Sequence, residues 1–410
     1  MRSGTPQLDI EDAPVRAIGE GEPPRRVSVL GATGSVGTST LDLLAYHSAR
    51  FEVVALTAQR NAKALAEAAR RHRAEHAVIG DPDHYLELKE LLAGSGTTVA
   101  AGPAGLVEAA ERPADCIMAA IVGAAGLEPT FAAAAQGTRV ALANKECLVS
   151  AGSVFMEAVE QAGGELIPVD SEHSAVLQCL DRGGREAIEC VHLTASGGPF
   201  RAWERSRLAT ATPEMATRHP NWSMGAKISV DSATLMNKGL ELIEAKHLFG
   251  LDPGQLGVVV HPQSVIHCLV SYLDGSVMAH MSTPDMTTPI AVSLAWPRRM
   301  STPTDRLDLV KLSTLTFERP DEQRFPSLRL AREAMERGGS APAILNAANE
   351  IAVEQFLAGK LGFLDIAALV EQTLCEAERL GYLCEVTDLA GVLEVDRSAR
   401  SLARACGQMA

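Results

Sequence analysis

The sequence predicts an α/β protein with an N-terminal parallel-sheet domain, a central mixed α+β domain and a C-terminal helical domain. Over residues 25–149, short β-branched runs alternate with longer helical patterns, which is typical of βαβ units. Over residues 171–297, strand patterns are separated by long polar loops, and four segments with helical spacing follow a Pro-rich connector. The predicted divisions are 1–24 (a disordered tail), 25–170, 171–297, 298–326 (the connector) and 327–410.

The elements follow from local composition and periodicity. β-Branched and apolar residues predict strands, whereas runs rich in Ala, Leu and Arg predict helices. In the first domain we expect strands at 26–30, 51–57, 77–79, 116–118 and 139–142 and helices at 38–47 and 61–73. In the second we expect strands at 189–194, 257–260, 265–272 and 276–281, and in the third helices at 327–337, 343–358, 364–380 and 396–409.

Composition and charge exclude several classes of function. With 410 residues and 46% apolar content, the chain can bury a large core. A formal net charge of -14 without clustered Lys and Arg argues against binding of nucleic acid. Eight scattered cysteines without a C-x-x-C pair favour a reducing cytoplasm over a disulfide framework or a zinc ribbon. The first 24 residues do not read as a secretory signal, and the apolar segment 116–127 is too short to span a bilayer, so we expect no membrane association.

A glycine-rich turn directly follows the first predicted strand. The segment 31–37 reads Gly-Ala-Thr-Gly-Ser-Val-Gly and opens the first helix, so its backbone N–H groups can hold a pyrophosphate, as in a Rossmann-like domain. A purely structural βα turn is the alternative. After the second strand, where NAD-binding proteins carry an acid, the chain has Gln59, Arg60 and Asn61. Arg60 can pair with a 2′-phosphate, which favours NADP, although a solvated residue at a helix start is also possible.

A polar segment follows the strand at 139–142. Asn144, Lys145 and Glu146 lie where the carboxyl end of a parallel strand faces a ligand. The sequence leaves two interpretations open, a contact with cofactor or substrate and a capped helix start.

Two carboxylates lie close together in the sequence after residue 168. Asp170 and Glu172 are two apart, and in extended backbone both would project to one side. Their mutual repulsion would be relieved by a hard divalent cation such as Mg²⁺ or Mn²⁺. Glu241 is the candidate third ligand. Zinc is disfavoured because no Cys or His set has suitable spacing.

A dense set of donors suits a phosphate or phosphonate, which predicts a phosphorylated sugar as substrate. Nearby glycines, including Gly239, would allow close approach of the backbone, although each donor taken singly is more often a turn or cap residue. Trp222 and Met224 lie on a loop bounded by Pro and Gly and predict a lid that excludes water. The donors are Ser196, His219, Ser232, Asn237 and Lys238, in segments too polar and glycine-rich to form core.

Six motifs together resemble the 1-deoxy-D-xylulose 5-phosphate reductoisomerase family, from residue 25 essentially to the C-terminus. They are Gly-Ala-Thr-Gly-Ser-Val-Gly, Asn-Lys-Glu, Val-Asp-Ser-Glu-His, Ser-Gly-Gly-Pro-Phe, His-Pro-Asn-Trp-Ser-Met-Gly and Met-Asn-Lys-Gly-Leu-Glu, in the family's order. The chain departs from the family at Gln59-Arg60, where Gly-Lys is usual, and at Cys147, where Ser is usual. Arg60 keeps the positive charge.

The resemblance implies a role for each matching residue. Asp170, Glu172 and Glu241 would bind the metal, and together with Lys145 and His219 they would be the catalytic residues. Substrate would contact Lys145, Ser171, Glu172, Ser196, His219, Trp222, Ser232, Asn237, Lys238 and Glu241. NADPH would contact Thr33, Gly34, Ser35, Val36, Gln59, Arg60, Asn61, Asn144, Glu146 and Gly225.

The resemblance also implies a reaction and an assembly. A divalent cation (Mn²⁺ or Mg²⁺, with Co²⁺ a further candidate) would assist a retro-aldol/aldol rearrangement, and NADPH would reduce the resulting aldehyde to 2-C-methyl-D-erythritol 4-phosphate for isoprenoid synthesis. A cytoplasmic, V-shaped homodimer with a mobile loop is expected. One rival is an aspartate-semialdehyde-type dehydrogenase, for which Cys147 is the nearest cysteine but lacks a neighbouring His. The other is a non-catalytic NADPH sensor, which would be expected to have lost the metal ligands.

Overall fold

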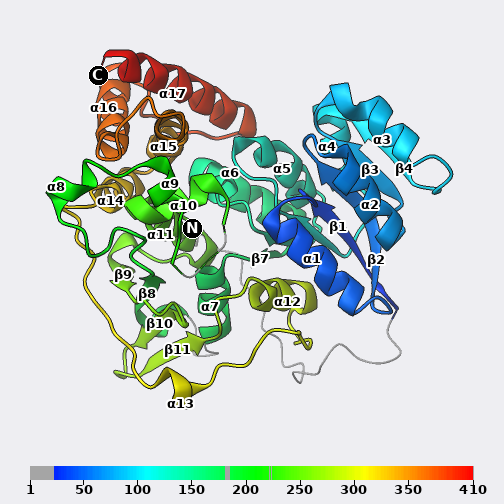
Figure 1. Cartoon of the computed structure of the whole chain (residues 1–410), viewed down its shortest axis with the longest axis horizontal. Helices are drawn as coiled ribbons and strands as arrows, with labels where there is room; N and C mark the ends of the chain where they lie inside the picture. The colour runs from blue at the N-terminus through cyan, green and yellow to red at the C-terminus, as the bar shows by residue number, and fades with distance from the viewer. Residues whose placement is uncertain (1–22, 181–184, 221, 223, 410) are drawn as a thin grey trace. The chain divides into compact units, whose positions relative to one another are not determined.

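The computed structural model describes residues 23–180, 185–220, 222 and 224–409, with no side-chain description at 409 (Figure 1). The predicted tail at 1–24 therefore lies almost wholly outside the described residues, as do Asn221 and Ser223 of the predicted lid. The chain divides into two compact units. Unit 1 comprises residues up to 147 with 155–174 and 285–304, and unit 2 comprises 148–154, 175–284 and 305 onward. The chain passes from one unit to the other within helices α6 (Glu146–Ala162) and α7 (Ser171–Cys179).

Unit 1 is built on a seven-stranded parallel sheet in the order β4-β3-β2-β1-β5-β6-β7. The central strands are mostly buried between helices, which is why they are rich in apolar residues, whereas the edge strand β4 has no buried residue. The parallel α/β prediction for this region is confirmed, and each of the five predicted strands is present. The strands are β1 (Arg25–Leu30), β2 (Phe51–Ala58), β3 (His76–Ile79), β4 (Thr98–Ala101), β5 (Cys116–Ala119), β6 (Val140–Leu142) and β7 (Leu166–Pro168).

The helices of unit 1 cover the sheet. Apolar residues of α1, α2 and α12 form one core with the strands, while α4 packs on β1, β2 and β3 and against α5. The segment 285–304 thus belongs to this unit, because α12 closes part of the core. The helices are α1 (Ser35–Tyr46), α2 (Ala62–His72), α3 (Tyr85–Leu91), α4 (Gly102–Glu111), α5 (Leu127–Ala135), the outer parts of α6, the start of α7 and α12 (Thr287–Ala295).

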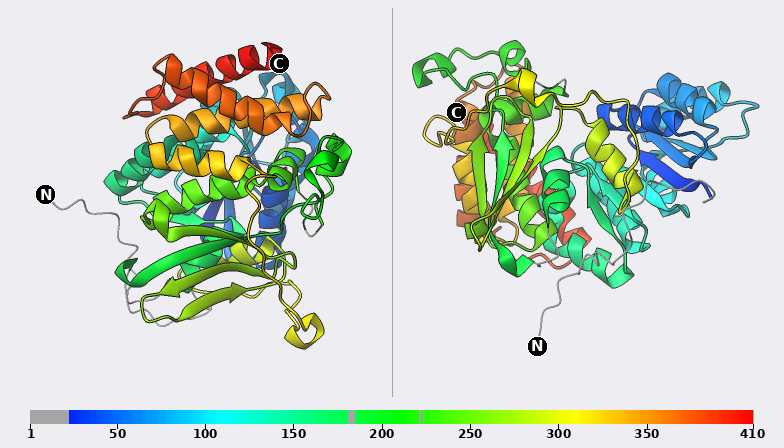
Figure 2. Two further views of the ribbon diagram at one scale, coloured as in Figure 1. Left: turned by 90° about the vertical axis from the view of Figure 1, so that its left-hand side faces the viewer. Right: turned by 90° about the horizontal axis from the view of Figure 1, so that it is seen from below.

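Unit 2 contains a four-stranded mixed sheet in the order β11-β10-β8-β9. β8 pairs with β9 in parallel, and β10 lies antiparallel to both β8 and β11. Figure 2 shows helices layered over this sheet. All four strands predicted for this region are present: β8 (Ile188–Ala195), β9 (Leu256–Val260), β10 (Ile266–Tyr272) and β11 (Val277–Met281).

In unit 2, α15 is buried along most of its length and contacts α10, α14, α16 and α17. The predicted helical C-terminal region is confirmed, with α17 starting earlier than predicted because the Asp388 side chain accepts a hydrogen bond from the Gly391 amide and caps it. Among the described residues, no helix is both long enough and apolar enough to cross a bilayer. The helices are α8 (Arg205–Leu208), α9 (Pro213–Ala216), α10 (Ala226–Thr234), α11 (Met236–Phe249), α13 (Leu309–Leu312), α14 (Ser327–Arg337), α15 (Ala341–Leu357), α16 (Asp365–Arg379) and α17 (Leu389–Met409).

Candidate active site

The glycine-rich turn joins β1 to α1 and leaves the start of the helix open. Gly31 has φ +87°, and a Cβ on Gly37 would lie 2.2 Å from the Gly31 carbonyl oxygen, so both positions require glycine. Gly34 precedes the first residue of α1, and no side chain caps the helix. Gly34 and Ser35 are exposed. The first N–H groups of α1 are therefore not capped by a side chain, and an anionic group can approach them.

The turn after β2 carries the residues predicted to choose the cofactor. Arg60 is 75% exposed at its side chain, and its Nε donates to Asp81 Oδ2 at 2.9 Å. Asn61 caps α2 by accepting from the Ala64 amide at 3.1 Å. Asp81 follows β3 and was not considered from sequence. Asp81 is the acid that pairs with Arg60, and the pKa of its carboxyl is lowered, mainly by the hydrogen bond from the Asp83 amide and further by Arg60.

The polar segment after β6 consists of the uncharged Asn144 and the charged residues Lys145 and Glu146, all three buried or nearly so. Asn144 is buried, its Nδ2 donates to the carbonyls of Ile121 and Gly123, and its Oδ1 accepts from the Cys147 amide at 3.1 Å. The capped helix start is therefore confirmed for Asn144. Lys145 is 9% exposed, and its Nζ lies 2.6 Å from Asp170 Oδ2.

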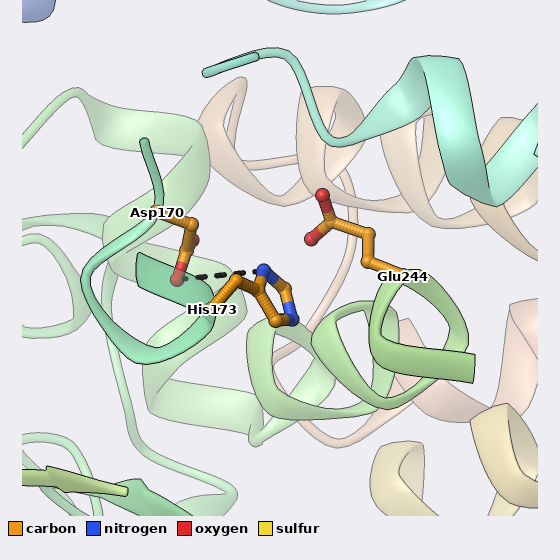
Figure 3. Close-up of side chains that lie close together, drawn as sticks. All are labelled: Asp170, His173 and Glu244. Carbon is orange, nitrogen blue, oxygen red and sulfur yellow. Dashed lines mark ion pairs between the residues drawn. The ribbon is translucent and has the colours of Figure 1, made fainter. Parts of the chain in front are cut away.

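Asp170 and Glu172 lie at the start of α7. Asp170 Oδ1 accepts from the Glu172 amide at 3.3 Å, and Ser171 Oγ donates to Glu172 Oε2 at 2.5 Å. The predicted extended backbone is wrong, because Glu172 belongs to the first turn of α7, but the two carboxylates do lie together, with one oxygen of each within 4.8 Å of the other. Figure 3 shows Asp170 with the fully buried His173, whose Nδ1 lies 3.9 Å from Asp170 Oδ1. Carboxylate oxygens of this kind suit a hard divalent cation.

In unit 2, a serine, a histidine and a tryptophan are linked. Ser196 follows β8, and its Oγ lies 2.9 Å from His219 Nε2 while accepting from the Gly198 amide at 3.1 Å. The Trp222 amide donates to His219 Nδ1 at 3.0 Å. The Trp222 ring packs edge-on to His267, with ring centroids 6.3 Å apart. His219 thus joins the predicted lid to the turn after β8, and His267 is a neighbour that the sequence did not single out.

The remaining donors are Ser232 on α10 and Asn237 and Lys238 on α11, and a sharp turn separates the two helices. Leu235, with φ +64°, separates the two helices. Glu241 is 1% exposed and accepts from Asn237 Nδ2 at 2.5 Å and from the ammonium of Lys238. The interpretation of these segments as too polar for the core is therefore wrong, because Lys238 and Glu241 are buried as a pair.

Two glycines of this region serve packing. A Cβ on Gly239 would lie 2.4 Å from Ala331 Cβ, so glycine here allows α11 to approach α14. This contradicts the prediction that Gly239 serves the approach of a phosphate. A Cβ on Gly198 would lie 2.8 Å from the Ser232 carbonyl oxygen, so the turn after β8 lies directly on α10. Gly225 precedes α10 and is exposed.

The predicted site residues fall into one group in each unit. Unit 1 contains the glycine turn, Arg60 and the Lys145–Asp170–Glu172 cluster, and unit 2 contains the Ser196–His219–Trp222 chain and the α10–α11 pair. Cys147 is fully buried, which does not suit a nucleophile. A parallel α/β unit with an uncapped glycine turn, accompanied by carboxylates, lysines and a histidine, defines the class of dinucleotide-dependent oxidoreductases.

Comparisons with known proteins specify the family. The family model described as 1-deoxy-D-xylulose 5-phosphate reductoisomerase matches residues 27–152, and the two models for C-terminal domains of that enzyme match 166–249 and 281–402. The reductoisomerase of Rhodospirillum centenum is 59% identical over 92% of this chain and 93% of its own length. That of Zymomonas mobilis is 58% identical over 86% and 90%. The chain belongs to the 1-deoxy-D-xylulose 5-phosphate reductoisomerase family.

Solved structures agree with this assignment. The Zymomonas mobilis reductoisomerase in complex with NADPH has a TM-score of 0.88 and 53% identity, covering 94% of this chain and 99% of its own. A reductoisomerase in complex with NADPH, fosmidomycin and magnesium has a TM-score of 0.89 and 42% identity, covering 94% and 98%.

Proposed function

We propose that this chain rearranges and reduces 1-deoxy-D-xylulose 5-phosphate to 2-C-methyl-D-erythritol 4-phosphate, with NADPH as hydride donor and a divalent cation. The observation that carries the proposal is family membership over nearly the whole chain, together with relatives solved with NADPH and with magnesium. The candidate residues are all present, which disfavours a non-catalytic sensor.

The cation ligands are Asp170 and Glu172 from unit 1 and Glu241 from unit 2. Three carboxylates fit a hard cation such as Mg²⁺, Mn²⁺ or Co²⁺ by the chemistry of their oxygens. When bound, the cation supplies Lewis acidity to the vicinal oxygens of the substrate. Lys145, 2.6 Å from Asp170, holds a positive charge beside this carboxylate and is also a donor for substrate oxygens. Ser171 orients Glu172 through its hydroxyl.

NADPH binds to unit 1. The open start of α1 receives the pyrophosphate, and Arg60 pairs with the 2′-phosphate, for which its exposed guanidinium is accessible. Unit 2 adds Gly225. The full set of cofactor contacts is Thr33, Gly34, Ser35, Val36, Gln59, Arg60, Asn61, Asn144, Glu146 and Gly225.

The phosphate group of the substrate binds to unit 2. His219 Nδ1 accepts from the Trp222 amide, so its Nε2 donates to Ser196 Oγ, and the Ser196 hydroxyl can in turn donate to a phosphate oxygen. His219 can donate to the phosphate when its bond to Ser196 opens. Trp222 covers the substrate and excludes water. The other donors are Ser232, Asn237 and Lys238.

The active form is a homodimer in the cytoplasm. β11 is an edge strand with exposed Val277 and Met278, and Leu273 beside it is 71% exposed. An apolar edge of this kind favours pairing with a second copy. Sedimentation of the wild type and of Met278→Lys tests this, since the charge should shift the population toward monomer.

The decisive experiment is NADPH oxidation, followed by absorbance, with 1-deoxy-D-xylulose 5-phosphate as substrate. Turnover is expected to disappear on chelation and to return when Mn²⁺ or Mg²⁺ is added. Folded protein that binds NADPH and never consumes it with any metal would instead favour the sensor.

A further inference from the structure

A buried asparagine of the C-terminal helical region is bonded to the helix that carries a substrate donor. Asn349 lies on α15 and is fully buried, and its Nδ2 donates to Asp231 Oδ1 on α10 at 2.8 Å. Asp231 is 1% exposed and also pairs with Lys227 Nζ at 2.9 Å, one turn earlier in α10. A contact between residues 118 positions apart in the chain thus joins α15 to α10.

The amide of Asn349 is not needed for packing alone. Its Oδ1 has no hydrogen-bond partner among the described residues, so burying it costs free energy that a leucine of similar size would avoid. Such a buried polar group requires a reason beyond filling space. The hydrogen bond that its side chain makes among the described residues leads to α10.

α10 in turn positions the phosphate donors. Ser232 directly follows Asp231 in this helix, and α11 with Asn237 and Lys238 follows after one turn residue. The turn carrying Ser196 lies on the backbone of Ser232, as the close approach at Gly198 shows. A shift of α10 would therefore move Ser232 and alter its distance from Ser196.

We propose that Asn349, acting through Asp231, is a positioning residue for the phosphate site. It fixes α10 against α15, so that Ser232 is held at the correct distance from Ser196 before substrate arrives. The inference rests on the proposed function, because it takes Ser232 to be a phosphate donor.

Asn346 offers a matched control on the same helix. It is equally buried, its Oδ1 also has no partner among the described residues, and its Nδ2 donates to Glu350 Oε1 at 3.2 Å. Glu350 keeps a basic partner in Arg400, at 2.7 Å, as Asp231 keeps Lys227. The two asparagines therefore differ in one respect that matters here, since the carboxylate bonded to Asn346 lies on α15 itself.

The experiment compares Asn349→Leu with Asn346→Leu and the wild type. Substrate KM, NADPH KM, kcat and the affinity for inorganic phosphate, measured by calorimetry without substrate, are determined for each. Asn349→Leu is expected to raise substrate KM and weaken phosphate binding about tenfold, the factor given by a loss of about 1.4 kcal/mol of binding free energy. NADPH KM should stay unchanged, and Asn346→Leu should leave substrate KM and phosphate affinity at wild-type values.

A double variant tests the route through Asp231. Asp231→Asn with Asn349→Leu should raise substrate KM no more than the larger single change, since coupled residues are not additive. If Asn349→Leu does not fold, the smaller Asn349→Ala replaces it, with the same expectation. Folded Asn349 variants with wild-type substrate KM and phosphate affinity, or equal effects from Asn346→Leu, would overturn the inference. A wild type without turnover of 1-deoxy-D-xylulose 5-phosphate would instead refute the proposed function, and with it the inference.

Discussion

Replacing Glu241 with Gln tests the third candidate ligand, and the structure shows that the change has two separable effects. Glu241 and Lys238 are a buried pair, with side-chain exposures of 1% and 6%. The substitution removes a ligand charge, and it also takes a carboxylate away from a buried ammonium. Breaking a buried pair from one side costs about 3–5 kcal/mol. For a chain of 410 residues, this corresponds to a fall in Tm of about 4–6 °C.

The assay must therefore separate the loss of ligation from the loss of stability. Glu241→Gln should abolish turnover at saturating Mn²⁺ while NADPH affinity, whose proposed contacts do not include Glu241, stays nearly intact. The double variant Lys238→Met/Glu241→Gln removes both charges, so its Tm should return toward the wild-type value while turnover stays absent. Activity in Glu241→Gln above about one tenth of wild type, with its Tm lowered as expected, would refute the assignment of Glu241 as a ligand, because even the loss of an outer-shell partner of a metal ligand typically costs about 10–100-fold.

Three further changes test other parts of the chain. Arg60→Ala should reduce the preference for NADPH over NADH, since it removes the guanidinium and leaves Asp81 to repel a 2′-phosphate. If the ratio of kcat/KM for NADPH to kcat/KM for NADH stays unchanged, Arg60 does not contribute to cofactor choice. Trp222→Ala should raise substrate KM more than NADPH KM, whereas equal increases would indicate a general folding defect. Burial, with a smaller effect from Lys246, lowers the pKa of His247 from 6.5 to about 4. Between pH 6.5 and 4, the unfolded chain therefore binds a proton at His247 more readily than the folded chain does. The contribution of neutral His247 to the free energy of unfolding, about 3 kcal/mol at most, is complete above pH 6.5 and is lost as pH falls toward 4. A pH profile of urea midpoints that falls as steeply in His247→Gln as in the wild type would contradict this.

The fold was largely predictable because its signals are local. β1 and β2 are rich in β-branched and apolar residues, so they are visible in a window of a few residues. The structure adds β4 and β7, of four and three residues, which the sequence did not single out. Residues 285–304 were assigned to the central domain and the connector, yet α12 completes the core of unit 1. That contact joins distant parts of the chain, and no local pattern reports it.

The candidate site was predictable in its residue types and less so in its geometry. Glu172 was placed in extended backbone because a strand precedes it, whereas the Asp170 side chain caps a helix at that point. Gly239 was read as a place for a ligand because its neighbours are polar, whereas α14 lies against it. In both cases the deciding partner is a hydrogen bond or a helix contact, which composition cannot show. The same limit applies to Asn349, whose partner lies more than a hundred residues away.

The lysines of the site follow a common arrangement within each unit. In unit 1 the ammonium of Lys145 lies beside Asp170, and in unit 2 that of Lys238 lies beside Glu241. Two of the three candidate ligand carboxylates thus each lie beside an ammonium group. Under the proposed function, a divalent cation bound by either carboxylate would compete with its lysine, and that lysine would then be available to an anionic substrate. Cation and sugar phosphate should therefore bind with positive coupling. By linkage, substrate should raise the affinity for Mn²⁺ by the same factor by which Mn²⁺ raises the affinity for substrate.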